Sequence, residues 1–218
     1  MLKAVLLSTA ALALIATSAN AASNVTLSKD GRFTSVLPHS GKSAPAHTGA
    51  KYVVSTVDKS KVGAYFCCYG STISGPSSII GAAYGVAEQF IPTSAATVSK
   101  IVAGIGYVSG DDKVTLTLYA DNGSNSPGAK IASGKATSTT EFGFCCGLVT
   151  ARIGSQNLKA NTPYWVGITA SGADWNAAPF QVNNEVNDYH YLANTSNGGS
   201  TWGSGYSETE YNPAIALE

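Results

Sequence analysis

The stretch DDKVTLTLYADNGSNSPGAKIASGKAT, residues 111–137, places an alternating segment before a turn. Two faces can be separated in its first half: Val114, Leu116 and Leu118 share one, and Thr115, Thr117 and Tyr119 share the other. A period of two is typical of a β-strand with one buried face. The residues that follow, ADNGSNSPG, are rich in Asp, Asn, Gly and Pro, which favour tight turns. The stretch therefore predicts antiparallel β-structure.

Further segments on both sides of this stretch have the same character. They are KYVVSTV (51–57), VSKIVAGIGYVSG (98–110), TPYWVGITAS (162–171) and PAIALE (213–218). No stretch after residue 21 carries a sustained helical period with capping residues. Short strands separated by turns at this spacing predict an all-β fold, an antiparallel sandwich.

The first 21 residues, MLKAVLLSTAALALIATSANA, have the organisation of a secretory signal peptide. Lys3 precedes an apolar run over 4–16, and Ala19-Asn20-Ala21 forms a small-x-small cleavage site. The apolar run is shorter than the roughly 20 residues needed to span a bilayer. We therefore expect cleavage before Ala22, an extracellular or periplasmic location and no stable membrane insertion.

The mature chain divides into two parts by composition. Residues 22–50 mix Ser, Pro, Gly and Lys with little periodicity, so we expect a loosely ordered N-terminal segment with one short strand at 24–27. Residues 51–218 carry the strand patterns and are expected to form the sandwich domain.

Charge excludes several classes of partner. The chain has 13 basic and 13 acidic residues, and charged residues make up only 12% of it. Such a chain lacks the basic field on which nucleic acid binding depends and offers no polybasic patch for anionic lipids. Nucleic acid is therefore not an expected partner.

The cysteines occur as two adjacent pairs, Cys67-Cys68 and Cys145-Cys146. In an oxidising compartment paired cysteines form disulfides by default. Neighbouring Cα atoms are only about 3.8 Å apart, whereas relaxed disulfides prefer about 4.4 to 6.8 Å. We therefore favour two bridges between the pairs, which in antiparallel strands would join 67 to 146 and 68 to 145. Strained rings within each pair and a thiolate metal site are the alternatives, although the C-x2-C spacing of zinc sites is missing.

One family resemblance follows from three stretches taken in order: AEQFIP (87–92), the 98–134 stretch that contains LYADNGSNSPGAKIASG, and LKANTPYWVGITASG (158–172). This order resembles the bacterial choice-of-anchor R domains, over about 86–202. The resemblance implies a jelly-roll-like β-sandwich on secreted or surface-displayed proteins, with no established enzymatic activity. The cysteine pairs depart from the family pattern.

The search for catalytic residues yields no convincing set, and no cofactor or metal is implied. His39 and His47 fall in the N-terminal segment, so only His190, within NDYHYL, stands where a site could form. No nucleophile elbow, HExxH motif or P-loop is present. A glycosidase would need two convergent carboxylates, for which the candidates are Asp174, Glu185, Asp188, Glu208 and Glu210. Asp121, Asn122 and Asn125 are turn residues first, and a calcium loop would lack its closing carboxylate.

The 172–213 region is unusually rich in aromatic residues among Asn, Gly and Ser. Trp175, Trp202, Tyr189 and Tyr191 are the main candidates for a binding surface, with His190 between the two tyrosines. Sugar rings bind on aromatic faces, because the apolar face of the ring stacks while its hydroxyls hydrogen-bond to nearby polar groups. Alternatively, Tyr189 and Tyr191 fill the sandwich core, and either tryptophan could also be buried.

Three functions follow from these observations. A secreted, non-catalytic binding or matrix module that recognises an extracellular polysaccharide or another cell-surface component agrees with the resemblance and the aromatic loops. A purely structural extracellular protein would have the same strands without an exposed aromatic cluster. A glycan-active hydrolase would require two of the candidate acids to meet in a cleft.

Replacing Cys67 and Cys68 with Ser should destabilise the protein by a few kcal/mol, because a bridge between the pairs closes a loop of roughly 80 residues in the unfolded chain. Non-reducing peptide mapping of the exported protein is expected to link 67 and 68 to 145 and 146. Rings confined to each pair would contradict this pairing.

Overall fold

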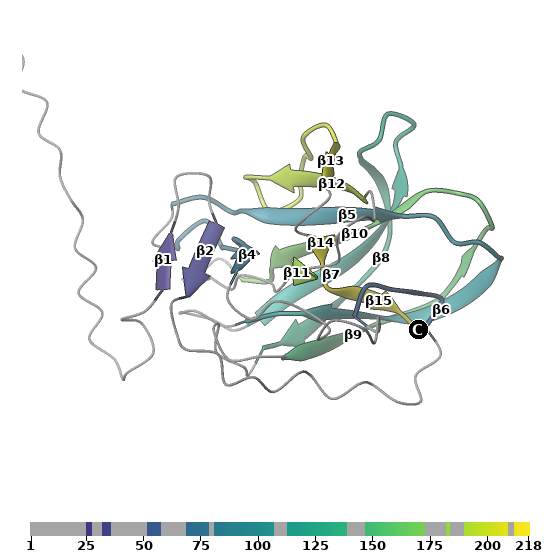
Figure 1. Cartoon of the computed structure of the whole chain (residues 1–218), viewed down its shortest axis with the longest axis horizontal. Coiled ribbons are helices and arrows are strands. Elements are labelled where there is room, and N and C mark those ends of the chain that lie inside the picture. Colours follow the sequence, from purple (N-terminus) through teal and green to yellow (C-terminus); the bar gives the residue numbers. More distant parts are fainter. Residues whose placement is uncertain are drawn as a thin grey trace, which may run out of the picture.

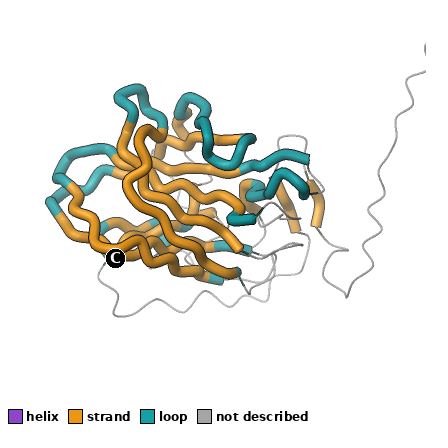
Figure 2. Tube along the Cα trace, turned by 180° about the vertical axis from the view of Figure 1, so that it is seen from behind, coloured by secondary structure: helices purple, strands orange, loops and turns teal. Residues whose placement is uncertain are grey.

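The computed structural model describes residues 25–27, 32–35, 52–57, 69–78, 81–106, 113–138, 147–172, 182–183, 190–208 and 212–218. For 25–27, 32–35, 69–70, 182–183, 190, 208 and 212, only the backbone path is described. Every regular element in these ranges is a strand (Figures 1 and 2). The described part contains no helix long and apolar enough to cross a membrane.

The larger sheet has six antiparallel strands in the order β13-β12-β5-β10-β7-β8. Its strands are β5 (Gly85–Phe90), β7 (Lys113–Asp121), β8 (Pro127–Thr137), β10 (Tyr164–Ala170), β12 (His190–Thr195) and β13 (Tyr206–Glu208). The central strand β10 pairs with β5 on one side and with β7 on the other. Figure 1 shows β12 and β13 beside β5. Strands far apart in the sequence therefore meet at the middle of this sheet.

The second sheet has four antiparallel strands in the order β3-β15-β6-β9. They are β3 (Val54–Ser55), β6 (Ala96–Gly104), β9 (Leu148–Leu158) and β15 (Ile215–Leu217). The chain crosses to this sheet after β5, returns for β7 and β8, and crosses again for β9. The two sheets are thus interleaved in sequence and form one body rather than two.

Two smaller pairings complete the described backbone. β1 (Val25–Leu27) pairs with β2 (Arg32–Ser35), which in turn pairs with β4 (Tyr69–Ser71). β11 (Val182–Asn183) pairs with β14 (Asn212–Pro213). The expected short strand at 24–27 corresponds to β1, whereas β2 carries no clear sequence signal. Through β4, this part of the N-terminal segment joins the region expected to be the sandwich domain (Figure 1).

The sequence-based expectation of an all-β, antiparallel sandwich is confirmed. The opening stretch forms the hairpin β7–β8, whose turn lies at 122–126. Every pairing between strands of the two sheets is antiparallel. The finer jelly-roll pattern that the family resemblance implies stays a prediction.

The main core lies between the sheets and takes alternate residues from each strand. On β10 the inward side chains are Tyr164, Val166 and Ile168, which pack with Leu116 and Leu118 of β7. The opposite wall comes from β6, β9 and β15, through residues such as Ile101, Ala151 and Ile215. Removal of these side chains from water is the main favourable term for the fold. Because side chains alternate, the remaining residues of each strand point away from this core.

The two sheets approach each other closely where β8 faces β9. A Cβ added at Gly134 of β8 would lie only 2.3 Å from the carbonyl oxygen of Arg152 in β9. No side chain fits between the two backbones at this point, which explains why the strand carries a glycine there. β8 is an edge strand of its sheet. Pairing with a further strand is disfavoured by Lys130, Lys135 and a bulge at Ile131.

Gly134→Ala should lower the free energy of unfolding by about 1 to 3 kcal/mol, because a methyl group would force β8 away from β9. Gly203→Ala is the matched control, since its added Cβ would meet nothing closer than 3.4 Å. Urea denaturation of both variants measures the difference. Equal stability of the two would show that the β8–β9 approach is not tight.

Candidate functional site

The outer face of the six-stranded sheet carries a second apolar cluster, away from the main core. It consists of Ala87, Tyr119, Trp165 and Ala193, which are buried, and the partly buried Trp202. Each of the first four points outward because its neighbours in the strand point inward. We call these five residues the outer-face cluster. Outward residues of an antiparallel sheet are commonly solvated, so a buried cluster here requires a cover.

Trp202 provides this cover by lying over small residues. Gly167 of β10 pairs with Ala87, and Ala87 pairs with Ala193. A Cβ added at Gly167 would lie 3.1 Å from Cζ2 of Trp202 and 2.8 Å from Cε2 of Tyr119. The Tyr119 and Trp202 rings meet edge to face, with centroids 5.7 Å apart. The row of small residues Gly167, Ala87 and Ala193 therefore leaves space on the sheet for the indole to pack.

Backbone hydrogen bonds hold the segment around Trp202, residues 196–205, onto the sheet. Gly203 N donates to Asn194 O at 2.9 Å, and Gly205 N donates to Asn125 O at 2.8 Å. The hydroxyl of Ser126 donates to Gly203 O at 2.8 Å. The 196–205 segment is thus fixed both to β12 and to the turn between β7 and β8.

Asp121, at the end of β7, is the centre of a polar network beside the cluster. Its Oδ2 accepts hydrogen bonds from Nε1 of Trp165 at 2.7 Å and from Nε2 of Gln89 at 3.1 Å. Its Oδ1 accepts one from Gly123 N at 2.7 Å. Hydrogen bonds to a carboxylate are about twice as strong as neutral ones, so Asp121 fixes the Trp165 indole and the Gln89 amide in place.

Tyr191 is an exposed aromatic residue on this face. It precedes Leu192, which pairs with Glu88, so the register brings Tyr191 next to Gln89. Alternation puts both on the side of Ala193 and Ala87. The Tyr191 side chain is 38% exposed. The exposed Tyr191 thus neighbours Gln89 on the adjacent strand, and the Gln89 amide hydrogen-bonds to Asp121.

The structure places two of the aromatic residues that the sequence singled out. Trp202 belongs to the outer-face cluster, and Tyr191 is exposed rather than part of the main core. His190 starts β12 and pairs with Glu208, but only its backbone is described. Trp175 and Tyr189 lie outside the described residues, as do the four cysteines, Cys67, Cys68, Cys145 and Cys146.

Three residues that sequence reasoning did not assign to a site organise it. Trp165 was noted only within a strand pattern and Gln89 only within AEQFIP, whereas Asp121 was considered as a turn residue and as a calcium ligand. A sequence signal for the first was available: Trp165 alternates with Tyr164 and Val166, so one of the two large aromatics had to face away from the core. Nothing in the sequence indicated that Asp121 would reach Trp165, which is 44 positions away.

The described acidic side chains are three, and each has a different setting. Glu88 is 1% exposed on the inner face of β5. Asp121 accepts the three hydrogen bonds given above, and Glu218 forms an ion pair with Lys100 at 2.6 Å. The side chains of the proposed hydrolase acids lie outside the described part of the chain: Asp174, Glu185, Asp188, Glu208 and Glu210. Within that part, no three or more His, Cys, Asp or Glu side chains gather as a metal site would require.

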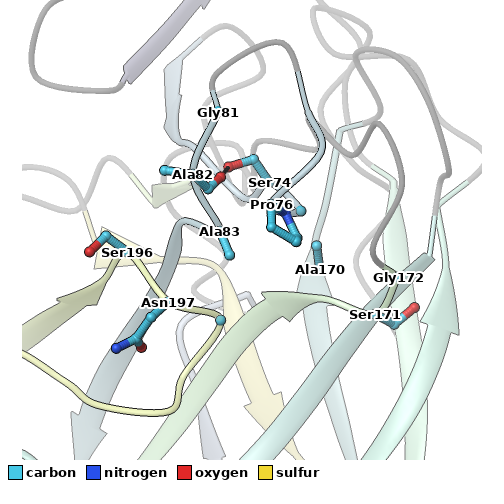
Figure 3. Close-up of a pocket in the computed structure, with 12 residues that line it drawn as sticks. Ser74, Pro76, Gly81, Ala82, Ala83, Ala170, Ser171, Gly172, Ser196 and Asn197 are labelled. Carbon is cyan, nitrogen blue, oxygen red and sulfur yellow. Dashed lines mark hydrogen bonds between the residues drawn. The ribbon is translucent and has the colours of Figure 1, made fainter.

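A depression of about 540 Å³ lies at one end of the sandwich, among the 74–76, 81–83, 170–172 and 196–198 loops. Figure 3 shows Pro76, Ala83 and Ala170 around it, with the Asn197 amide turned away from them. None of its described lining residues is ionisable. Its volume falls in the range of small-molecule sites, but this lining supplies neither a charge nor an aromatic face.

Comparison with models of known protein families gives no match to this chain, and comparison with curated proteins gives none. The resemblance to choice-of-anchor R domains therefore stays a prediction. The outer face must be interpreted from its own chemistry.

Trp202→Ala should lower the free energy of unfolding by about 2 kcal/mol or more, because it exposes Tyr119 and the row of small residues to water. Tyr191→Ala is the matched control on the same face, and its cost should be about 1 kcal/mol or less since the ring is exposed. Thermal denaturation of the two variants gives the comparison. A Trp202→Ala protein as stable as wild type would mean that the indole is not an anchor.

Proposed function

We propose that this chain is a secreted, non-catalytic binding module that recognises an extracellular glycan on the outer face of its six-stranded sheet, around Tyr191. The observation that carries the proposal is the exposed Tyr191, which the strand register places beside Gln89, whose amide hydrogen-bonds to Asp121. An aromatic face beside fixed polar groups matches the two surfaces of a sugar ring.

The polar half of the proposed site can accept a further hydrogen bond from a ligand. From the described residues, Asp121 accepts two hydrogen bonds at Oδ2 and one at Oδ1. A carboxylate oxygen has two lone pairs, so Oδ1 can take a further bond from a sugar hydroxyl. Because Trp165 and Gly123 already hold the carboxylate, binding would cost little side-chain ordering.

The apolar half extends beyond Tyr191. Ile91 follows β5 with 54% of its surface exposed, two positions after Gln89. Residues two apart in an extended chain share a face, so Ile91 adds apolar surface on the far side of Gln89 from Ala87. A patch of this kind suits a polysaccharide chain lying along the sheet more than a small molecule enclosed in a pocket.

Export and the bacterial surface-domain family belong to the proposal as well. The leader peptide predicted over residues 1–21, the near-neutral charge and the antiparallel sandwich are all compatible with a module that works outside the cell. A purely structural extracellular role is the second candidate, and the use of Trp202 as an anchor favours it. The two differ in whether the Tyr191 face has a ligand.

Tyr191→Ala should weaken binding to an insoluble polysaccharide about fivefold, since a stacked ring contributes on the order of 1 kcal/mol. Pull-down with a panel of insoluble glycans measures the bound fraction, and an unchanged melting temperature shows that the variant is folded.

The matched control is Tyr206→Ala. Tyr206 is 37% exposed but pairs with Leu192, whose side chain lies on the opposite face from Ala193. It should bind like the wild type. If wild-type protein binds no glycan in the panel, or if both variants bind equally, the glycan proposal fails and the structural role is the better account.

A further inference from the structure

The turn that joins β7 to β8 contains one of the two Asn-Gly sequences in the chain. Asn122-Gly123 lies in this turn, and Asn197-Gly198 lies in the 196–205 segment. In both, the asparagine is exposed and the glycine has a positive φ, +83° at Gly123 and +69° at Gly198. The two sequences are therefore alike in asparagine exposure and in the positive φ of the glycine, and they differ in what their polar atoms contact.

At Asn122 the attacking nitrogen and the side-chain carbonyl of a deamidation reaction each have a hydrogen-bond partner that would assist the reaction. Gly123 N donates its hydrogen to the Asp121 carboxylate at 2.7 Å. Ser124 N donates to Oδ1 of Asn122, also at 2.7 Å. The first contact gives the nitrogen a proton acceptor, and the second stabilises negative charge on Oδ1 as the side-chain carbonyl is attacked.

At Asn197 the equivalent atoms have structural contacts instead. Gly198 N donates to the backbone carbonyl of Ala83 at 2.8 Å, which is no base. Oδ1 of Asn197 accepts from Thr201 N and from the Thr195 hydroxyl, while its Nδ2 donates to the Thr201 hydroxyl at 2.7 Å. The Asn197 amide is thus held at both ends, so it cannot turn toward the Gly198 nitrogen without breaking these bonds.

We propose that Asn122 is a site of self-catalysed deamidation, with Asp121 as the base. The Asp121 carboxylate takes the proton from Gly123 N, and the nitrogen lone pair forms a bond to Cγ of Asn122. The bond from Cγ to Nδ2 then breaks, and the amide group takes up that proton and leaves as ammonia. Water opens the resulting succinimide ring at either carbonyl, leaving Asp or isoaspartate at 122.

The product changes how this turn holds its neighbours. Either product adds a negative charge next to Asp121, and isoaspartate also adds a methylene group to the backbone. Asn122 N donates to Ser126 O across the turn, and Asn125 O accepts from Gly205 in the 196–205 segment. Lengthening the backbone between these contacts should loosen the attachment of the 196–205 segment, and with it the cover that Trp202 provides.

The test compares rates in the folded protein and in free peptides. Purified full-length protein and synthetic peptides of residues 118–128 and 193–203 are incubated at neutral pH. Peptide mapping that separates Asn, Asp and isoaspartate then follows both sites. Asn122 should react at least about tenfold faster in the folded protein than in its peptide, as expected of a positioned base. Asn197 should react more slowly in the protein than in its peptide.

Asp121→Asn tests the base directly and should remove the rate advantage at Asn122 while leaving the Asn197 rate unchanged. If this variant does not fold, the dependence of the wild-type rate on pH replaces it. With Asp121 as the base, the rate should rise less steeply with pH than in the peptide, where hydroxide removes the proton. A folded rate at Asn122 equal to or below the peptide rate, or an undiminished rate in Asp121→Asn, overturns the proposal.

Discussion

Strand β10 contributes side chains to both the main core and the outer face, so its register constrains the whole molecule. This strand is hydrogen-bonded on both edges, to β5 and to β7, so it cannot shift without breaking two ladders. Tyr164, Val166 and Ile168 face the main core, whereas Trp165 and Gly167 face outward. A slip by one residue would exchange the two sets and place an indole among the packed side chains between the sheets. The register of β10 therefore fixes both the core and the outer face.

The outer face follows from this register. Trp165 is 0% exposed although it lies on the side of the sheet that commonly contacts water. It is covered because Gly167, Ala87 and Ala193 are small enough for the Trp202 indole to pack against this cluster. The 196–205 segment is thus packed against the sheet and held by hydrogen bonds at both ends. An aromatic residue in a glycine-rich loop can serve as an anchor, and among the described residues Tyr191 is an exposed aromatic residue of this face.

The turn at 121–126 contacts both the outer-face cluster and the 196–205 segment, which its sequence does not suggest. Asp121 closes the turn through Gly123, and the same carboxylate fixes the Trp165 indole and the Gln89 amide. Asn125 and Ser126 hold the backbone of the 196–205 segment. One carboxylate thus links hairpin closure, the outer-face cluster and the polar half of the proposed glycan site. The same carboxylate accepts a hydrogen bond from the Gly123 nitrogen that would attack Asn122. Asp121 would therefore both stabilise the turn and promote its deamidation.

The class of fold and the β7–β8 hairpin could be predicted from the sequence, because alternation and turn composition are local properties. Val114, Leu116 and Leu118 could be assigned to a buried face from their spacing alone, and the structure confirms that all three lie in the main core. The positions of Trp202, Tyr191 and Asp121 were decided only by tertiary structure. Whether a tryptophan beside glycines is exposed depends on what lies beneath it, and here Ala87, Gly167 and Ala193 come from three strands that adjoin only in the folded sheet. The bond between Asp121 and Trp165 likewise requires β7 and β10 to pair in one register, which no local pattern encodes.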